Sequence, residues 1–125
     1  MKIIDAHCHI ASLDYIPKSF IDGALSNMAT ALRAQGVPAS PAKLFSMFEQ
    51  KMQDPLCDGL VQEMEKAGIS KSVLLIADFS YALRDCKLNI QESFENHRRI
   101  LERHPGKFEV FGGVDPRWEI GRAHV

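Results

Sequence analysis

Residues 3–10 (IIDAHCHI) constrain the fold more than any other segment, because they form a β-strand pattern that contains two histidines. Side chains two apart on a strand share a face, so the pattern predicts Asp5, His7 and His9 on one face. The opposite face is apolar and suits a covering of helices. Two imidazoles on one face can converge on a metal ion. We therefore expect His7 and His9 to be metal ligands at the carboxyl end of a first strand.

Two further strand patterns alternate with helical ones. Residues 73–77 are apolar without alternation, which is typical of a parallel strand buried on both faces, and residues 109–114 predict a third strand. Helices are expected over residues 59–66, closed by Gly68, and after an Asn89–Glu92 capping box. Alternating strands and helices predict right-handed βαβ units in a parallel sheet.

Residues 11–55 delay the second strand and have a helical character of their own. Apolar residues recur at helical spacing between residues 20 and 32, and Ser40-Pro41 is a typical helix start. We interpret residues 11–55 as a helical insertion after the first strand. We hypothesise that it shapes a lid or a substrate wall.

The predicted fold class is α/β, namely the N-terminal part of a metal-dependent (β/α)8 TIM-like barrel. A closed barrel needs about 250 residues, whereas this chain has 125, so we expect residues 1–118 to form an incomplete barrel. Residues 120–125 (IGRAHV) match the translation of a common sequencing adapter. We interpret them as an adapter-derived tail of a chain cut from a longer parent; a genuine short tail is the alternative.

Composition excludes several partners. The net charge is -1, without the basic excess that binds nucleic acid. No apolar stretch approaches the roughly 20 residues of a membrane span, and residues 1–10 lack the pattern of a signal peptide. The 3 cysteines do not suggest a disulfide framework, so a reducing, cytoplasmic location is expected.

Two motifs resemble those of the amidohydrolase superfamily, in the amidohydrolase-related branch that includes aminocarboxymuconate-semialdehyde decarboxylases. They are residues 4–9 (IDAHCH) and residues 112–117 (GGVDPR). The resemblance implies a distorted barrel with a divalent metal, commonly zinc, held in part by His7 and His9. It implies hydrolysis of a small organic substrate through metal-activated water. Decarboxylation, a lyase reaction of the same family, is the alternative.

The resemblance also implies what the chain lacks. The family's later histidines and its strand-eight aspartate, which acts in proton transfer, have no counterpart here, so the catalytic residue is unknown. We expect the chain alone to be inactive and the longer parent to be an enzyme. Family members often pair, which implies a homodimer at full length.

Three other polar residues are candidates for the site. Asp5 would either orient a ligand histidine or tie down the N-terminus. Asp115 would either fix a turn before Pro116 or act in catalysis. Arg117 would either bind a substrate carboxylate with both arms of its guanidinium or lie on the surface.

Two other functions stay open. TatD-type metal-dependent DNases also begin with Asp-x-His-x-His, but they usually show Gly-x-His-Pro after the third strand, where this chain has residues 113–116 (GVDP). A non-catalytic truncated product is the second alternative, because an open parallel sheet leaves an edge strand unpaired. The cysteines and His97 are expected to have packing roles.

Overall fold

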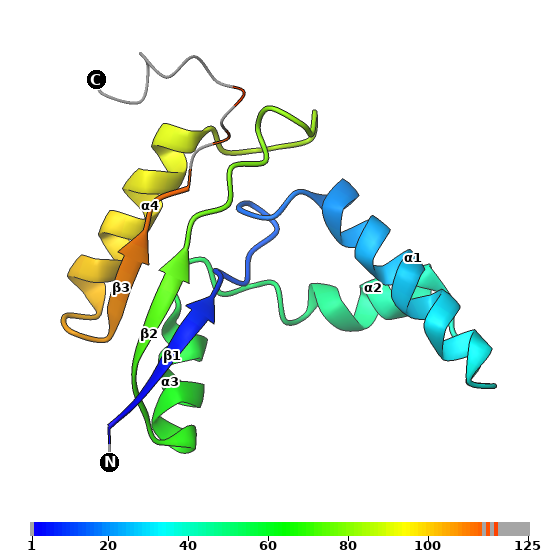
Figure 1. Cartoon of the computed structure of the whole chain (residues 1–125), viewed down its shortest axis with the longest axis horizontal. Coiled ribbons are helices and arrows are strands. Elements are labelled where there is room, and N and C mark those ends of the chain that lie inside the picture. The colour runs from blue at the N-terminus through cyan, green and yellow to red at the C-terminus, as the bar shows by residue number, and fades with distance from the viewer. Residues whose placement is uncertain (1, 114, 116, 118–125) are drawn as a thin grey trace.

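The computed structural model describes residues 2–113, 115 and 117. These residues form three strands and four helices (Figure 1). In chain order the elements are β1 (Ile3–Cys8), α1 (Lys18–Ala34), α2 (Pro41–Glu49), α3 (Asp58–Ala67), β2 (Ile69–Leu75), α4 (Ile90–Arg103) and β3 (Phe108–Phe111).

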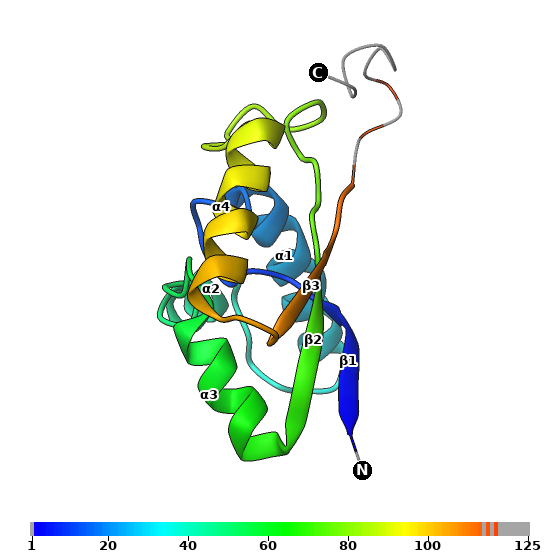
Figure 2. The same cartoon turned by 90° about the vertical axis from the view of Figure 1, so that its left-hand side faces the viewer.

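The strands form one parallel sheet in the order β1-β2-β3. Helices α3 and α4 lie on the same side of this sheet (Figure 2). Between them and the strands lies the main core, in which Leu74 of β2 and Ile100 of α4 are fully buried. No described helix covers the opposite face of the sheet. On that face Ile4 and Phe111 of the outer strands are exposed, whereas Val73 of the central strand is buried.

The predicted fold class is wrong, because the described strands form an open sheet and not a (β/α)8 barrel. In a closed barrel every strand pairs on both sides. Here β1 and β3 each pair with β2 alone among the described strands. The alternation of strands and helices, and the parallel pairing deduced from it, are confirmed.

The predicted helix ends agree with the structure. The Ser40 hydroxyl accepts a hydrogen bond from the backbone N–H of Lys43 at the start of α2. Asn89 and Glu92 form a reciprocal capping box at the start of α4. Gly68 ends α3 with φ of 71°, a left-handed conformation that favours glycine.

Strand β2 begins earlier than predicted, at Ile69 instead of residue 73. Its first half is polar, which hides the strand pattern in the sequence. The neighbouring strands bind these polar groups: the Ser70 hydroxyl donates to the Ile3 carbonyl, and Lys71 pairs with Glu109. Cross-strand partners therefore extend the strand beyond its apolar half.

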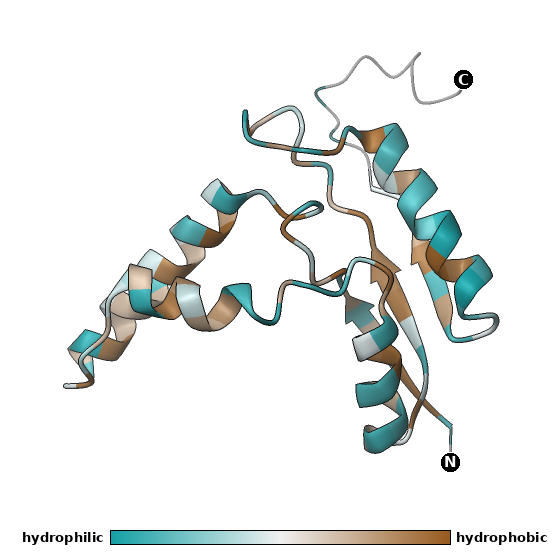
Figure 3. Cartoon of the chain, turned by 180° about the vertical axis from the view of Figure 1, so that it is seen from behind, coloured by the Kyte–Doolittle hydropathy of each residue, from teal (hydrophilic) through white to brown (hydrophobic). Residues whose placement is uncertain are grey.

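Residues 11–55 contain the predicted helices, α1 and α2. The two helices pack against each other and extend away from the sheet, beyond the edge at β1 (Figure 1). Apolar residues occur along both helices (Figure 3). Of the described helices, none has the length and apolar character needed to cross a bilayer. The tail interpretation concerns residues 120–125, which lie outside the described residues.

Candidate functional site

The two histidines of the first strand meet at its carboxyl end. His7 lies in β1, which ends at Cys8, so His9 is the first residue beyond the strand. Their Nε2 atoms are 3.1 Å apart, and their ring centroids are 5.0 Å apart with the planes at 77°. The structure therefore brings together the two predicted metal ligands.

The ring of His9 is held by the neighbouring strand. Its Nδ1 lies 3.0 Å from the backbone carbonyl oxygen of Leu75, the last residue of β2. Because a carbonyl oxygen only accepts, Nδ1 carries the proton of this bond. In the neutral ring, Nε2 then carries a lone pair, which accepts a hydrogen bond from His7 Nε2–H at 3.1 Å. Such a bond on the second nitrogen is the usual way in which proteins orient a ligand histidine.

The spacing of the two nitrogens fits one metal ion. Zinc binds imidazole nitrogen at ~2.0–2.1 Å, so two nitrogens on one tetrahedral ion lie about 3.3–3.4 Å apart. The observed 3.1 Å is within a few tenths of an ångström of that separation. No group of three or more His, Cys, Asp or Glu that could hold a metal occurs in the described part of the chain. His7 and His9 thus fit two positions of a metal site.

Asp5 contacts the backbone and not a ring. Its Oδ1 accepts the backbone N–H of His7 at 3.1 Å. The pairing of β1 with β2 shifts register between Asp5 and Cys8, so simple two-residue alternation does not hold across this segment. Asp5 thus holds the peptide of a candidate ligand, a contact different from the two roles predicted for it.

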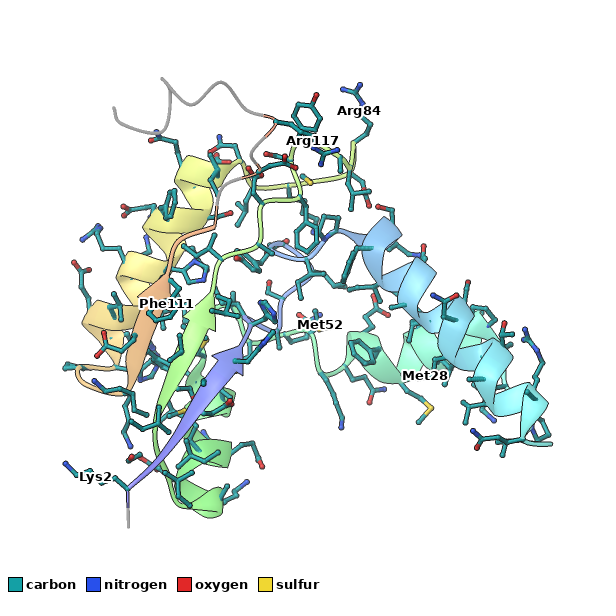
Figure 4. The ribbon with its side chains drawn as sticks, in the orientation of Figure 1. Lys2, Met28, Met52, Arg84, Phe111 and Arg117 are labelled. Carbon is teal, nitrogen blue, oxygen red and sulfur yellow. The ribbon has the colours of Figure 1, made fainter. Side chains whose placement is uncertain are left out.

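Asp115 and Arg117 belong to a second cluster. Asp115 Oδ1 accepts the backbone N–H of Arg117 at 2.9 Å and its guanidinium Nε–H at 2.8 Å. The Arg117 guanidinium also lies over the ring of Tyr81, 4.3 Å from its centroid. Figure 4 shows Arg117 above the carboxyl ends of the strands.

The Asp115–Arg117 ion pair determines the ionisation of Asp115 and the availability of the Arg117 guanidinium. Hydrogen bonds from Arg117 lower the pKa of Asp115 to about 2, so its carboxylate is charged at neutral pH. The backbone N–H of Asp115 also donates to Oδ2 of Asp78 at 3.4 Å, and Asp78 lies in the loop that follows β2. The geometry matches the turn-fixing role for Asp115. In this arrangement the guanidinium of Arg117 is engaged by Asp115 and Tyr81 and does not present a free fork for a carboxylate.

Sequence reasoning missed a buried pair behind the histidines. The hydroxyl of Tyr15 accepts the backbone N–H of Ala77 at 2.9 Å, and its ring makes an edge contact with His97 at 5.2 Å between centroids. Burial raises the pKa of Tyr15 to about 12. Helical periodicity predicted a packed His97, but nothing in the sequence indicated Tyr15 or the Leu75 carbonyl.

His97 is only 1% exposed. Its Nδ1 lies 2.7 Å from the carbonyl oxygen of Ser93, so Nδ1 carries the proton of that bond. Its Nε2 has no hydrogen-bond partner among the described residues. Burial lowers the pKa of His97, and the nearby His9 lowers it further. His97 is therefore a neutral side chain that packs within the fold.

The cysteines have the character predicted for structural thiols. All three are free, and Cys8 packs against the main core. Burial raises the pKa of Cys8, and it raises the pKa of Cys57 to about 12. Both thiols are therefore protonated at neutral pH in this structure.

Comparison with known proteins gives no relative: no protein-family model, curated protein or solved structure matches this chain.

Proposed function

We propose that the chain binds a divalent metal ion, zinc in the first place, through Nε2 of His7 and Nε2 of His9. The site would serve a metal-dependent hydrolase that acts on a small organic substrate. The observation that supports this most directly is the convergence of the two Nε2 atoms at 3.1 Å, at the carboxyl end of a parallel strand.

The chain's own residues would hold the ligands in place. The Leu75 carbonyl keeps the proton of His9 on Nδ1, so its Nε2 has a lone pair. That lone pair accepts from His7 Nε2–H in this structure and would bind an ion once the proton of His7 lies on its other nitrogen. Asp5 holds the peptide of His7 through its backbone N–H. A bound ion would supply Lewis-acid chemistry and a water-derived nucleophile near neutral pH.

The two histidines do not complete a catalytic site. Catalytic zinc usually has three protein ligands and one open position. The remaining protein ligands and the general base are not among the groups that the described residues bring together. We therefore propose metal binding for the chain itself and propose hydrolysis for a form of the protein in which these groups are supplied. The resemblance to the amidohydrolase superfamily remains a prediction in its support.

Metal titration tests the first half of this proposal. We expect wild-type protein to bind one zinc ion per chain in isothermal titration calorimetry. Loss of a partner that merely orients a ligand already costs about 10–100-fold in affinity. We therefore expect His7→Ala and His9→Ala each to weaken zinc binding by at least about that factor.

His104→Gln is the matched control, because it removes a histidine that contacts Asp58 and the Leu56 carbonyl instead. Its zinc affinity should equal that of wild type. Wild-type affinity in both His7→Ala and His9→Ala would refute the site. Turnover is assayed in a longer form of the protein that supplies the remaining ligands, because the chain alone is expected to be inactive. In that form, zinc binding without turnover of a panel of small amides, esters and lactones would retain the metal site and remove the hydrolase. Release of carbon dioxide from small carboxylates would favour a decarboxylase.

We also propose a reducing, cytoplasmic location. The free thiols of Cys8, Cys57 and Cys86 support it, since exposure to an oxidising compartment would favour disulfides. Fractionation of the native host with an antibody to the chain would test this location.

A further inference from the structure

The described chain has two separate hydrophobic cores. The main core lies between the sheet and helices α3 and α4. A smaller one is formed by the α1–α2 hairpin, by which we mean residues 18–49, and by the segments that flank it. Its buried residues are Ile21 and Leu25 of α1 and Met52 beyond α2, and Ala11, Leu13 and Ile16 pack against them. Ile16 is the one partly buried residue that packs against both cores among those described. The hairpin is therefore packed as a unit of its own.

Helix contacts agree with this division. Helices α1 and α2 pack against each other, and neither packs against a strand or another helix among the described elements. Figure 4 places Met52 where the chain returns from α2 toward the sheet, whereas Met28 lies far out along α1. No layer of side chains therefore holds the hairpin against the sheet.

Two chain segments join the hairpin to the rest of the molecule, and they run side by side. Ser12 and Gln53 form an isolated antiparallel bridge. The backbone N–H of Asp54 donates to the Ala11 carbonyl at 2.9 Å. Because both connections pass through one place, they form a natural pivot.

One further contact sets the position of the hairpin. Asp85, in the loop between β2 and α4, accepts the backbone N–H of Ser19 at 2.8 Å and the Ser19 hydroxyl at 2.6 Å. Beside this pair, the rings of Phe20 and Phe79 lie 4.9 Å apart. Pro17 precedes α1 and supplies no side-chain cap. Asp85 therefore satisfies a free N–H of the first turn from a distant part of the chain.

The contact is narrow. An open hollow of about 570 Å³ lies beside it, lined by the start of α1 (Lys18, Ser19 and Asp22) and by residues 82–85 of the loop. Loop and helix thus meet through the Asp85–Ser19 pair and the two rings, with open space alongside. Loss of so small a contact would leave the two cores intact.

We propose that the α1–α2 hairpin is a hinged unit that pivots where residues 11–17 run beside residues 52–55, with Asp85 and Ser19 as its latch. When the latch is closed, the hairpin keeps one orientation to the sheet. When it opens, the hairpin reorients as a body. This inference rests on contacts within the chain and does not depend on metal binding at His7 and His9.

Residual dipolar couplings of backbone amides test this directly, since the full chain of 14.0 kDa suits solution NMR. In wild type, couplings from the hairpin and from the sheet with α3 and α4 should fit a single alignment tensor. In Asp85→Ala, each unit should still fit its own structure. The hairpin should then need a different tensor of smaller magnitude, which is the signature of independent motion.

Asp22→Ala is the matched control, because it removes an ion pair within the first turns of α1, with Lys18, and leaves the hydrogen bonds of the latch. It should keep the single tensor. Asp85→Ala couplings that still fit one tensor of wild-type magnitude would overturn the proposal. If Asp85→Ala unfolds α1, Ser19→Ala decides, since it removes only the hydroxyl bond: partial loss of the common tensor supports the latch, and an unchanged tensor overturns it.

Discussion

His97 couples the stability of the fold to pH. Burial, and then the nearby His9, lower its pKa in the folded state below the ordinary value near 6.5. The unfolded chain therefore takes up a proton at a higher pH than the folded chain. The stability that neutral His97 contributes is complete above about pH 6.5 and is lost as the pH falls through the pKa of the folded state. Over that range the free energy of unfolding falls by at most about 1.4 kcal/mol per pH unit.

We expect His97→Gln to flatten this dependence of unfolding free energy between about pH 7 and pH 5, because glutamine does not titrate. Urea denaturation at a series of pH values measures it. An unchanged slope in His97→Gln would assign the acid sensitivity to other groups.

Among the glycines that the structure describes, Gly113 is the one at which a side chain would be least tolerated. A Cβ there would lie 2.2 Å from the backbone carbonyl oxygen of Ile76, a contact that no rotamer change relieves. We expect Gly113→Ala to lower the free energy of unfolding by roughly 1–3 kcal/mol or more. Gly23, inside α1, would meet open space instead, and Gly23→Ala should raise stability by up to about 1 kcal/mol. Equal urea midpoints for the two variants would contradict this contrast.

The helix caps differ in what they support at the level of elements. The side chain of Asn89 accepts from Glu92 N–H at 2.9 Å and begins α4, which buries Ser93, His97 and Ile100. We expect Asn89→Ala to cost about 0.5–2 kcal/mol of global stability, with Asn89→Asp close to wild type.

Ser40 caps α2, a helix without a buried residue. Ser40→Ala should therefore speed amide exchange in α2 and leave global unfolding nearly unchanged.

At the scale of the whole molecule, the sequence predicts the order of the helices and strands better than it predicts whether the sheet closes into a barrel. Caps at Ser40, Gly68 and Asn89 act locally, so the helix ends could be predicted from neighbouring residues. Closure of a sheet depends on partners for the outer strands, and the barrel prediction extended the alternation of three strands and their helices beyond the residues present. The polar start of β2 was missed because its partners lie on β1 and β3.

The candidate site shows the same limit. The pairing of His7 and His9 follows from their spacing, and the structure brings their nitrogens together. The groups around them cannot be predicted from spacing: the Leu75 carbonyl belongs to the backbone, and Tyr15 reaches Ala77 from an irregular segment. Asp85 likewise lies in a loop without a recognisable pattern, although it accepts a backbone N–H from the first turn of α1.

The anchor of His9 has a consequence for the time at which the site forms. His9 and Leu75 are separated by 66 residues, and the whole hairpin lies between them. The partners β2 and β3 are joined by a shorter crossover through α4. Because closing a longer loop costs more entropy, β2, α4 and β3 should assemble first during folding and β1 should dock afterwards. The two imidazoles would then be oriented late, so that the proposed metal site would form only once β1 has joined the sheet.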